Sequence, residues 1–212
     1  MRLILVRHGE SVGNFENRLQ GHTDYELTPR GEAQAKQTAD RLHELGVKSV
    51  YTSPLRRAAA TAMVIGDRLG CPPVELPGVR EYDFGELAGA TYQELRQRFA
   101  ANPVGPDGRP ADRVYPGEEG RHTFFERVTG AMWDVAERHP ADSVAVVSHG
   151  GPIALFCQTV LGLPYRRPMP FAIDNCSLSI VQVHDGGEPA PGRPRAILLT
   201  LNDRCHLQGL EE

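Results

Sequence analysis

A short apolar run at positions 3–6 leads directly into Arg7, His8 and Gly9. An apolar run of this length, closed by a glycine turn, is typical of a buried strand in a parallel sheet. Because open α/β sheets bind ligands at the carboxyl ends of their strands, we expect Arg7 and His8 to lie at a ligand site. A histidine there can attack an anionic phosphorus centre, whereas a lone histidine is more often only a hydrogen-bonded residue at a strand end.

Strand and helix signals alternate along the rest of the chain, which is the pattern of an α/β fold. A Thr-Pro pair at 28–29 predicts the start of a helix that Gly46 closes. A Ser-Pro pair at 53–54 predicts a second helix, which runs to about Leu69. The other expected elements are strands at 47–52 and 143–148, helices at 123–138 and from 152 to about 161, and antiparallel strands at 177–183 and 196–201. We therefore predict a single α/β domain over residues 1–212, a three-layer α/β/α sandwich with a mostly parallel central sheet.

Positions 102–120 differ from the rest of the chain, because they are rich in proline, glycine and charge and show little periodicity. A connection of this length is unusual in a compact domain and is often functional. We expect a lid over the ligand site; the alternative interpretation is a disordered surface insertion. The two strands near the end of the chain offer an edge on which a homodimer could form.

The composition limits the classes of partner. The net charge is −4, with 40% hydrophobic and 24% charged residues, so the sequence has no broad basic surface for nucleic acid or a membrane. The four cysteines lack the spacing of a metal or redox site, and no apolar segment is long enough to cross a bilayer or to act as a secretory signal. We therefore expect a cytoplasmic protein with reduced thiols, in which a local cluster of arginine and histidine binds any anion.

Two further cationic side chains are expected beside Arg7 and His8. Arg56 lies in the first turn of the helix that follows the second strand, and His149 directly follows the strand at 143–148. Because parallel strands end at the same edge of a sheet, these groups can converge there. Helix N-termini at that edge add N–H donors that favour a bound phosphate. Two histidines with two arginines favour a phosphate site over a chance arrangement.

This set of residues fits phosphoryl transfer, which depends mainly on stabilising charge at the equatorial oxygens. Two guanidinium groups and a protonated His149 can hold those oxygens. Neighbouring cations lower the pKa of His8 and keep it neutral, so that it can form a covalent phosphohistidine. The expected partner is a small phosphorylated substrate, and the expected reaction uses no metal ion and no cofactor.

A leaving alkoxide needs a proton, so a carboxylic acid is expected near the phosphate. The segment after position 79 contains Glu81, Asp83 and Glu86. Spacing alone does not separate these three residues, and the segment could also be a solvated acidic loop. Glu81 is our candidate for the group that protonates the leaving oxygen and then activates the water that attacks the phosphohistidine.

Several short motifs, taken in order, resemble the histidine phosphatase superfamily, the phosphoglycerate mutase-like group. The motifs are LVRHGES at 5–11 with Asn14, GHTD at 21–24, LTPRG at 27–31, TSPLRRA at 52–58, Arg80-Glu81 before Phe84-Gly85, VSHGG at 147–151, and Leu201-Asn202-Asp203 with His206-Leu207. They extend over nearly the whole chain, and their combination is highly specific. The resemblance implies that His8 is the phosphorylated nucleophile and that Glu81, at the matching Arg-Glu position, is the acid and base.

The same resemblance implies which residues surround the substrate. They are Arg7, Arg56 and His149 in the phosphate pocket, Asn14 and the Gly150 N–H beside it, and Gln20 and Gly21 in a loop that can touch substrate. It favours Arg56 over Arg57, which is then expected on the helix surface or behind the pocket.

Three functions fit this resemblance: a phosphatase, a cofactor-dependent phosphoglycerate mutase and a phospho-ligand binding protein without activity. A mutase must hold a substrate carboxylate with additional basic residues, but the segment after Glu81 is acidic and the 102–120 insertion has only Arg109 and Arg113. The run Pro-Gly-Glu-Glu at 116–119 also departs from the Pro-Gly-Gly-Glu-Ser of the family. An inactive protein is disfavoured because the predicted nucleophile and its cationic partners are all present. We therefore expect hydrolysis of small phosphomonoesters.

Overall fold

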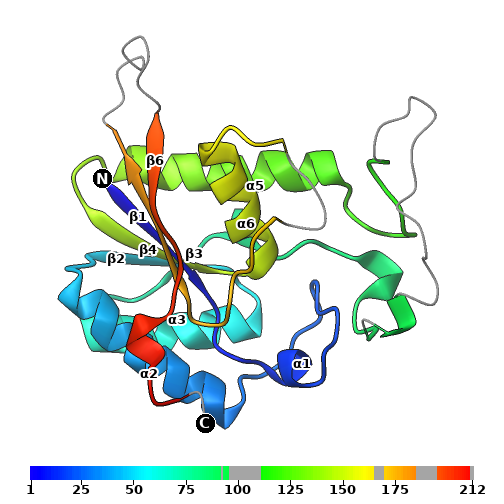
Figure 1. Ribbon diagram of the computed structural model, residues 1–212, viewed down its shortest axis with the longest axis horizontal. Helices are drawn as coiled ribbons and strands as arrows, with labels where there is room; N and C mark the ends of the chain where they lie inside the picture. The colour runs from blue at the N-terminus through cyan, green and yellow to red at the C-terminus, as the bar shows by residue number, and fades with distance from the viewer. Residues whose placement is uncertain (92, 96–110, 165–169, 185–194, 211–212) are drawn as a thin grey trace.

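The computed structural model describes residues 1–91, 93–95, 111–164, 170–184 and 195–210, and its centre is a sheet with the strand order β3-β2-β4-β1-β5-β6 (Figure 1). The strands are β1 (Arg2–Arg7), β2 (Ser49–Thr52), β3 (Val74–Glu75), β4 (Ser143–Ser148), β5 (Leu178–Val183) and β6 (Ala196–Asp203). Strands β1 to β4 pair in parallel, whereas β5 pairs antiparallel with both β1 and β6. In the part of the chain that the structure describes, the sheet is therefore mostly parallel, as predicted.

Helices cover both faces of this sheet. The described helices are α1 (Val12–Phe15), α2 (Pro29–Glu44), α3 (Arg56–Leu69), α5 (Arg121–Arg138) and α6 (Gly150–Val160), with short 3-10 turns η1 (Pro77–Val79), η2 (Gly85–Leu87) and η3 (Cys205–Leu207). Helices α2 and α3 lie on one side of the sheet, and α5 and α6 lie on the other (Figure 1). The predicted three-layer α/β/α arrangement is confirmed.

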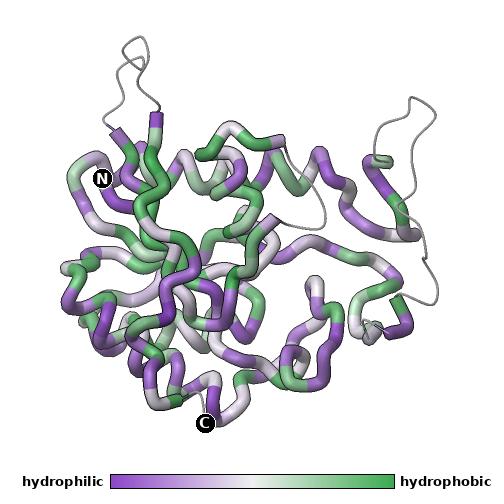
Figure 2. The backbone as a smooth tube through the Cα atoms, in the orientation of Figure 1, coloured by the Kyte–Doolittle hydropathy of each residue, from purple (hydrophilic) through white to green (hydrophobic). Residues whose placement is uncertain are grey.

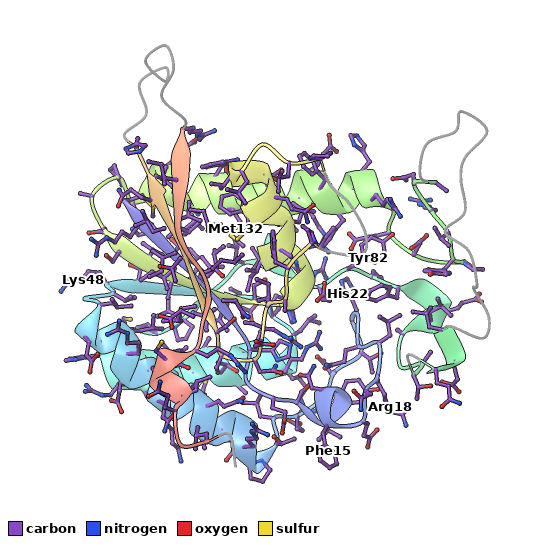
Figure 3. All side chains as sticks on the ribbon, viewed as in Figure 1. Phe15, Arg18, His22, Lys48, Tyr82 and Met132 are labelled. Carbon is purple, nitrogen blue, oxygen red and sulfur yellow. The ribbon has the colours of Figure 1, made fainter. Side chains whose placement is uncertain are left out.

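The apolar run in β1 contributes to two separate cores, because successive side chains of a strand point to opposite faces. Leu3 and Leu5 pack into the core beneath α5 and α6, and Ile4 and Val6 pack into the core beneath α2 and α3. Figure 2 shows this apolar character along the central strands, and Figure 3 shows Met132 of α5 inside the molecule. Burial on both faces holds the carboxyl end of β1 in a fixed place, where Arg7 ends the strand and His8 follows it.

Some element boundaries differ from the prediction. Helix α3 begins at Arg56 with Leu55 as its N-cap residue, and not directly after Ser53. The Ser53 hydroxyl accepts a hydrogen bond from the Leu55 N–H at 3.3 Å and is buried beneath the helix start. The Ser-Pro signal therefore marks a turn before the helix, and this shift changes which arginine faces the site. Helix α5 begins two residues before the predicted position 123, at Arg121.

The predicted lid lies only partly within the described residues, because positions 102–110 fall outside them. The described part packs beside the predicted acid segment: the Glu119 N–H donates to the Asp83 carbonyl at 3.2 Å, and the Glu86 N–H donates to the Pro116 carbonyl at 3.2 Å.

Among the described helices, none is both long and apolar enough to cross a membrane. Strand β6 lies at the end of the strand order, and the homodimer stays a prediction.

Candidate active site

A cavity of about 720 Å³ lies where β1 and β4 end. The predicted residues that line it are Arg7, His8, Asn14, Gln20, Gly21, Glu81 and Gly150. His149 is fully buried behind the lining, with its ring centroid 5.1 Å from that of His8. The structure therefore brings the predicted residues together, with Arg56 as the exception.

The surroundings of His8 determine which ring nitrogen can react. His8 is buried, and its Nδ1 lies 2.7 Å from the Gly9 carbonyl oxygen. Because a carbonyl only accepts, Nδ1 carries the proton and Nε2 is the unprotonated nitrogen. Burial lowers the pKa of His8 well below 6.5, and the nearby Arg57 and Arg7 lower it further. His8 is therefore a neutral imidazole with an unprotonated Nε2, as the sequence predicted from its cationic neighbours.

Arg57, and not Arg56, is the α3 arginine that reaches this nitrogen. Its Nε lies 3.2 Å from His8 Nε2, and its two terminal nitrogens donate to the carbonyls of Thr23 at 2.9 Å and Gly21 at 2.8 Å. Arg57 is 1% exposed, and burial lowers its pKa to about 10, so it stays charged at neutral pH. The expectation that Arg57 lies on the helix surface was wrong.

Arg56 points away from the cavity. Its side chain is exposed and pairs with Glu26 at 2.8 Å, while its backbone N–H donates to the Asp24 carboxylate at 3.0 Å. Consecutive helical residues project about 100° apart, so a shift of one residue exchanges an inward side chain for an outward one. The structure therefore places Arg57, and not the predicted Arg56, at the cavity beside His8.

His149 is neutral as well. Its Nε2 lies 2.8 Å from the Ser53 hydroxyl, and among the described residues its buried Nδ1 has no hydrogen-bond partner. Burial lowers the pKa of His149 well below 6.5, with further lowering by Arg57, His8 and Arg7. The expectation of a protonated imidazole is therefore corrected. A neutral His149 can still donate one hydrogen bond from Nδ1 when the Ser53 hydroxyl donates to Nε2.

Asn14 has a fixed amide orientation. Its Oδ1 accepts from the Ser11 N–H at 3.2 Å, from the Ser11 hydroxyl at 2.9 Å and from the Asn175 side chain at 3.2 Å. The same Asn175 amide donates to the His8 carbonyl at 2.9 Å. With its oxygen engaged in this way, Asn14 presents its NH₂ group as the donor for an anion in the cavity.

The loop of residues 20–23 connects Arg57 to the acidic segment. Gly21 has a positive φ of 51°, which suits glycine, and its carbonyl accepts from Arg57. The next residue is His22, which is labelled in Figure 3, and its Nε2 donates to the Glu81 carbonyl at 2.8 Å. Gln20 lines the cavity, and its side-chain oxygen lies 2.8 Å from the Ser11 hydroxyl oxygen. This loop therefore contacts both Arg57, which lies beside His8, and the backbone of Glu81, the candidate acid.

Of the three candidate acids, Glu81 is the one on the described cavity wall. Its carboxylate accepts from the Tyr82 N–H at 2.8 Å and from the Gly151 N–H at 3.1 Å. Asp83 instead accepts from the Gly85 N–H and lies 3.4 Å from His22, and Glu86 is exposed. The structure therefore separates three residues that spacing left equivalent.

Gly151→Ala is expected to displace the Glu81 carboxylate. A methyl group at position 151 would overlap Glu81 Oε1. We expect about a 100-fold loss of kcat on alkyl phosphates, since a shift of about 1 Å in a reacting group has an effect of that order. The matched control is Gly130→Ala in α5, where an added methyl meets nothing within 4 Å. Steady-state kinetics of both variants check this, and unchanged kinetics of Gly151→Ala would contradict it.

The sequence did not predict the contacts of several residues around the cavity. Ser53 was assigned as a helix cap but contacts His149, and Asn175 carried no motif that pointed to the site. His22 stood in the matched GHTD run, which was the available signal for its contact with Glu81. Within the described ranges, no group of three or more His, Cys, Asp or Glu side chains is arranged to hold a metal ion.

The sequence and the fold both match known proteins. The chain matches the family model of the histidine phosphatase superfamily (branch 1) over residues 3–190. A "probable phosphoglycerate mutase" of Cronobacter sakazakii is 34% identical over 98% of this chain and 95% of its own length. Phosphoserine phosphatase 1 of Hydrogenobacter thermophilus is 31% identical over 98% of this chain and 94% of its own length.

Solved structures of other proteins share this fold. A mycobacterial glucosyl-3-phosphoglycerate phosphatase superposes with a TM-score of 0.79 at 27% identity, covering 96% of this chain and 99% of its own. The alpha-ribazole phosphatase of Shigella flexneri gives a TM-score of 0.78 at 26% identity, covering 96% of each chain. With a family model that spans most of its length and relatives above 30% identity, this chain belongs to the histidine phosphatase superfamily.

Proposed function

We propose that this protein hydrolyses small phosphomonoesters through a phosphohistidine on His8, with Glu81 as general acid and base. The observation that carries the proposal is the unprotonated Nε2 of His8, held beside Arg57 in a cavity that Glu81 also lines. The phosphatase names of several relatives support it.

In the first step, the electron pair on His8 Nε2 forms a bond to phosphorus while the ester P–O bond breaks. Protonated Glu81 gives its proton to the departing alkoxide, so a neutral alcohol leaves. Positive charge that develops on the imidazole is stabilised by the Nδ1–H bond to the Gly9 carbonyl. Arg57, Arg7 and Asn14 line the cavity, and in this proposal their N–H groups hold the equatorial oxygens.

In the second step, the Glu81 carboxylate takes a proton from water, and the oxygen of that water attacks the phosphohistidine. The P–N bond breaks, inorganic phosphate leaves, and the electron pair returns to His8 Nε2. Glu81 is then protonated again, so both residues regain their starting states. Splitting the displacement in this way gives two steps that are each easier than direct attack by water.

A direct test is hydrolysis of p-nitrophenyl phosphate by the purified protein, with and without EDTA. The proposal predicts turnover that survives chelation and a phosphoenzyme that can be trapped by rapid quench. No turnover of any phosphomonoester would contradict it and favour a binding protein. The Cronobacter relative is named a probable phosphoglycerate mutase, so 3-phosphoglycerate should be tested too. Isomerisation that depends on bisphosphoglycerate, with little hydrolysis, would favour the mutase.

Glu81→Gln is expected to slow alkyl phosphates by about 10²- to 10⁴-fold, the usual contribution of general acid catalysis. Activated aryl phosphates should lose much less in the first step, because p-nitrophenolate leaves without a proton. The measurement is the rate of phosphoenzyme formation for both substrates. Glu86→Gln, an exposed change in the same segment, is the matched control. Equal losses on both substrates would argue against Glu81 as the acid.

A further inference from the structure

Arg127 links helix α5 to the backbone around Glu81. Its Nη1 donates to the carbonyls of Gly78 at 2.9 Å and Arg80 at 2.7 Å, and its Nη2 donates to the Glu81 carbonyl at 2.8 Å. Its side chain is 17% exposed, so these are mostly buried, charge-assisted hydrogen bonds. The segment of residues 78–81 is therefore attached to α5 by one guanidinium group.

Gly78 makes this close approach possible. A methyl group at position 78 would lie 2.5 Å from the Ala131 side chain and 3.0 Å from the Arg127 carbonyl. The short turn η1 can therefore sit directly on α5, with its carbonyls within reach of Arg127.

Glu119 completes the arrangement from the other side. Its carboxylate makes two bonds to Arg127, at 2.7 Å from Nε and 2.6 Å from Nη2. One of its oxygens also accepts from the Asp83 N–H at 2.8 Å, and its own N–H donates to the Asp83 carbonyl at 3.2 Å. The pair of Arg127 and Glu119 thus holds the chain on both sides of Glu81, at residues 78–81 and at Asp83.

We propose that Arg127 and Glu119 are positioning residues that fix the Glu81 carboxylate relative to His8. The inference rests on the function proposed above, because it assumes that Glu81 transfers the proton. Neither side chain bonds the Glu81 carboxylate, which is held by backbone N–H groups of Tyr82 and Gly151. The N–H of Tyr82 belongs to the residue that follows Glu81. The position of the Glu81 carboxylate therefore depends on a fixed backbone at residues 80–82.

Arg127→Lys tests this inference. A lysine keeps the charge but cannot make the planar set of bonds to three carbonyls and a carboxylate. We expect phosphoenzyme formation from alkyl phosphates to fall by about 10- to 100-fold, the effect of a small misplacement of a reacting group. Formation from p-nitrophenyl phosphate should change by less than about threefold, since that leaving group needs no proton. Arg138→Lys, an exposed change in the last turn of the same helix, should alter neither rate.

A double-mutant cycle separates positioning from a general structural role. In a Glu81→Gln background, Arg127→Lys should cause little further loss on alkyl phosphates, because the group that it positions is already absent. If Arg127 only stabilised the fold, its effect would be the same in both backgrounds and on both substrates. Additive effects, equal losses on the two substrates, or no loss would each overturn the inference.

A second variant and the activity of the wild type complete the test. If Arg127→Lys does not fold, as judged by circular dichroism, Glu119→Gln carries the same comparison, because it removes the charge from the pair and keeps the side-chain shape. If the wild-type protein hydrolyses neither substrate, the proposed function fails. If the wild type hydrolyses both and the variants lose activity equally on both, only the positioning role fails.

Discussion

Arg57→Ala is expected to lower kcat by about 10²- to 10³-fold, the effect of removing one donor that stabilises developing charge. Arg56→Ala should stay within about twofold of the wild type. Arg57 is buried at the His8 nitrogen, whereas Arg56 makes an exposed ion pair with Glu26, and such pairs contribute about 0.2–1 kcal/mol. The comparison is informative because the two arginines are adjacent in the same helical turn.

The measurement is the rate of phosphoenzyme formation, together with thermal unfolding of each variant. Arg57→Ala also removes the donor from the Gly21 and Thr23 carbonyls, and leaving a buried acceptor such as the Gly21 carbonyl unsatisfied costs about 1–3 kcal/mol. Arg57→Lys therefore serves as a second variant, which keeps the charge but not the three-way hydrogen bonding. A larger kinetic loss in Arg56→Ala than in either Arg57 variant would contradict the assignment of Arg57 as the phosphate ligand from α3.

The order of these two arginines shows where sequence reasoning reached its limit. Apolar runs and cap signals predicted a helix after β2, but they placed its start directly after Ser53, whereas α3 begins at Arg56. A shift of that size rotates a side chain by about 100° for each residue, which is enough to exchange Arg56 for Arg57. By contrast, Arg7 is the last residue of β1, and His8 and His149 directly follow β1 and β4, so small boundary errors do not move them away from the strand ends.

The choice among the three candidate acids shows a second limit of prediction from sequence. Glu81, Asp83 and Glu86 occupy one short stretch, and nothing local distinguishes their carboxylates. The distinction comes from contacts distant in sequence, since the Gly151 N–H binds Glu81 and Arg127 holds its backbone. Such tertiary contacts leave no periodic signal. Family resemblance selected Glu81 correctly as the carboxylate on the cavity wall, but the same reasoning selected the wrong arginine.

His8→Ala is expected to abolish the phosphoenzyme and to lower turnover by about 10⁴- to 10⁶-fold, as for removal of other enzymatic nucleophiles. The residual rate should show no burst of p-nitrophenol and no trapped phosphohistidine, since the other described residues that line the cavity include no histidine. His149 lies behind the cavity wall, with its Nε2 bonded to Ser53. Arg56→Ala again serves as the control for handling and folding. A normal burst in His8→Ala would exclude His8 as the nucleophile.

The same variant should change how stability depends on pH. The pKa of His8 in the folded protein lies well below its unfolded value near 6.5, chiefly because of burial, so below pH 6.5 the unfolded chain binds a proton that the folded protein does not. His8 therefore makes the wild type lose stability as the pH falls from 6.5 toward the lowered pKa, by up to about 1.4 kcal/mol per pH unit. His8→Ala removes this contribution, while that of His149 remains. Urea unfolding at pH 7.5 and 5.5 should thus show that the variant loses less stability than the wild type when the pH is lowered. An equal or larger loss in the variant would mean that His8 is already protonated in the folded wild type at pH 5.5.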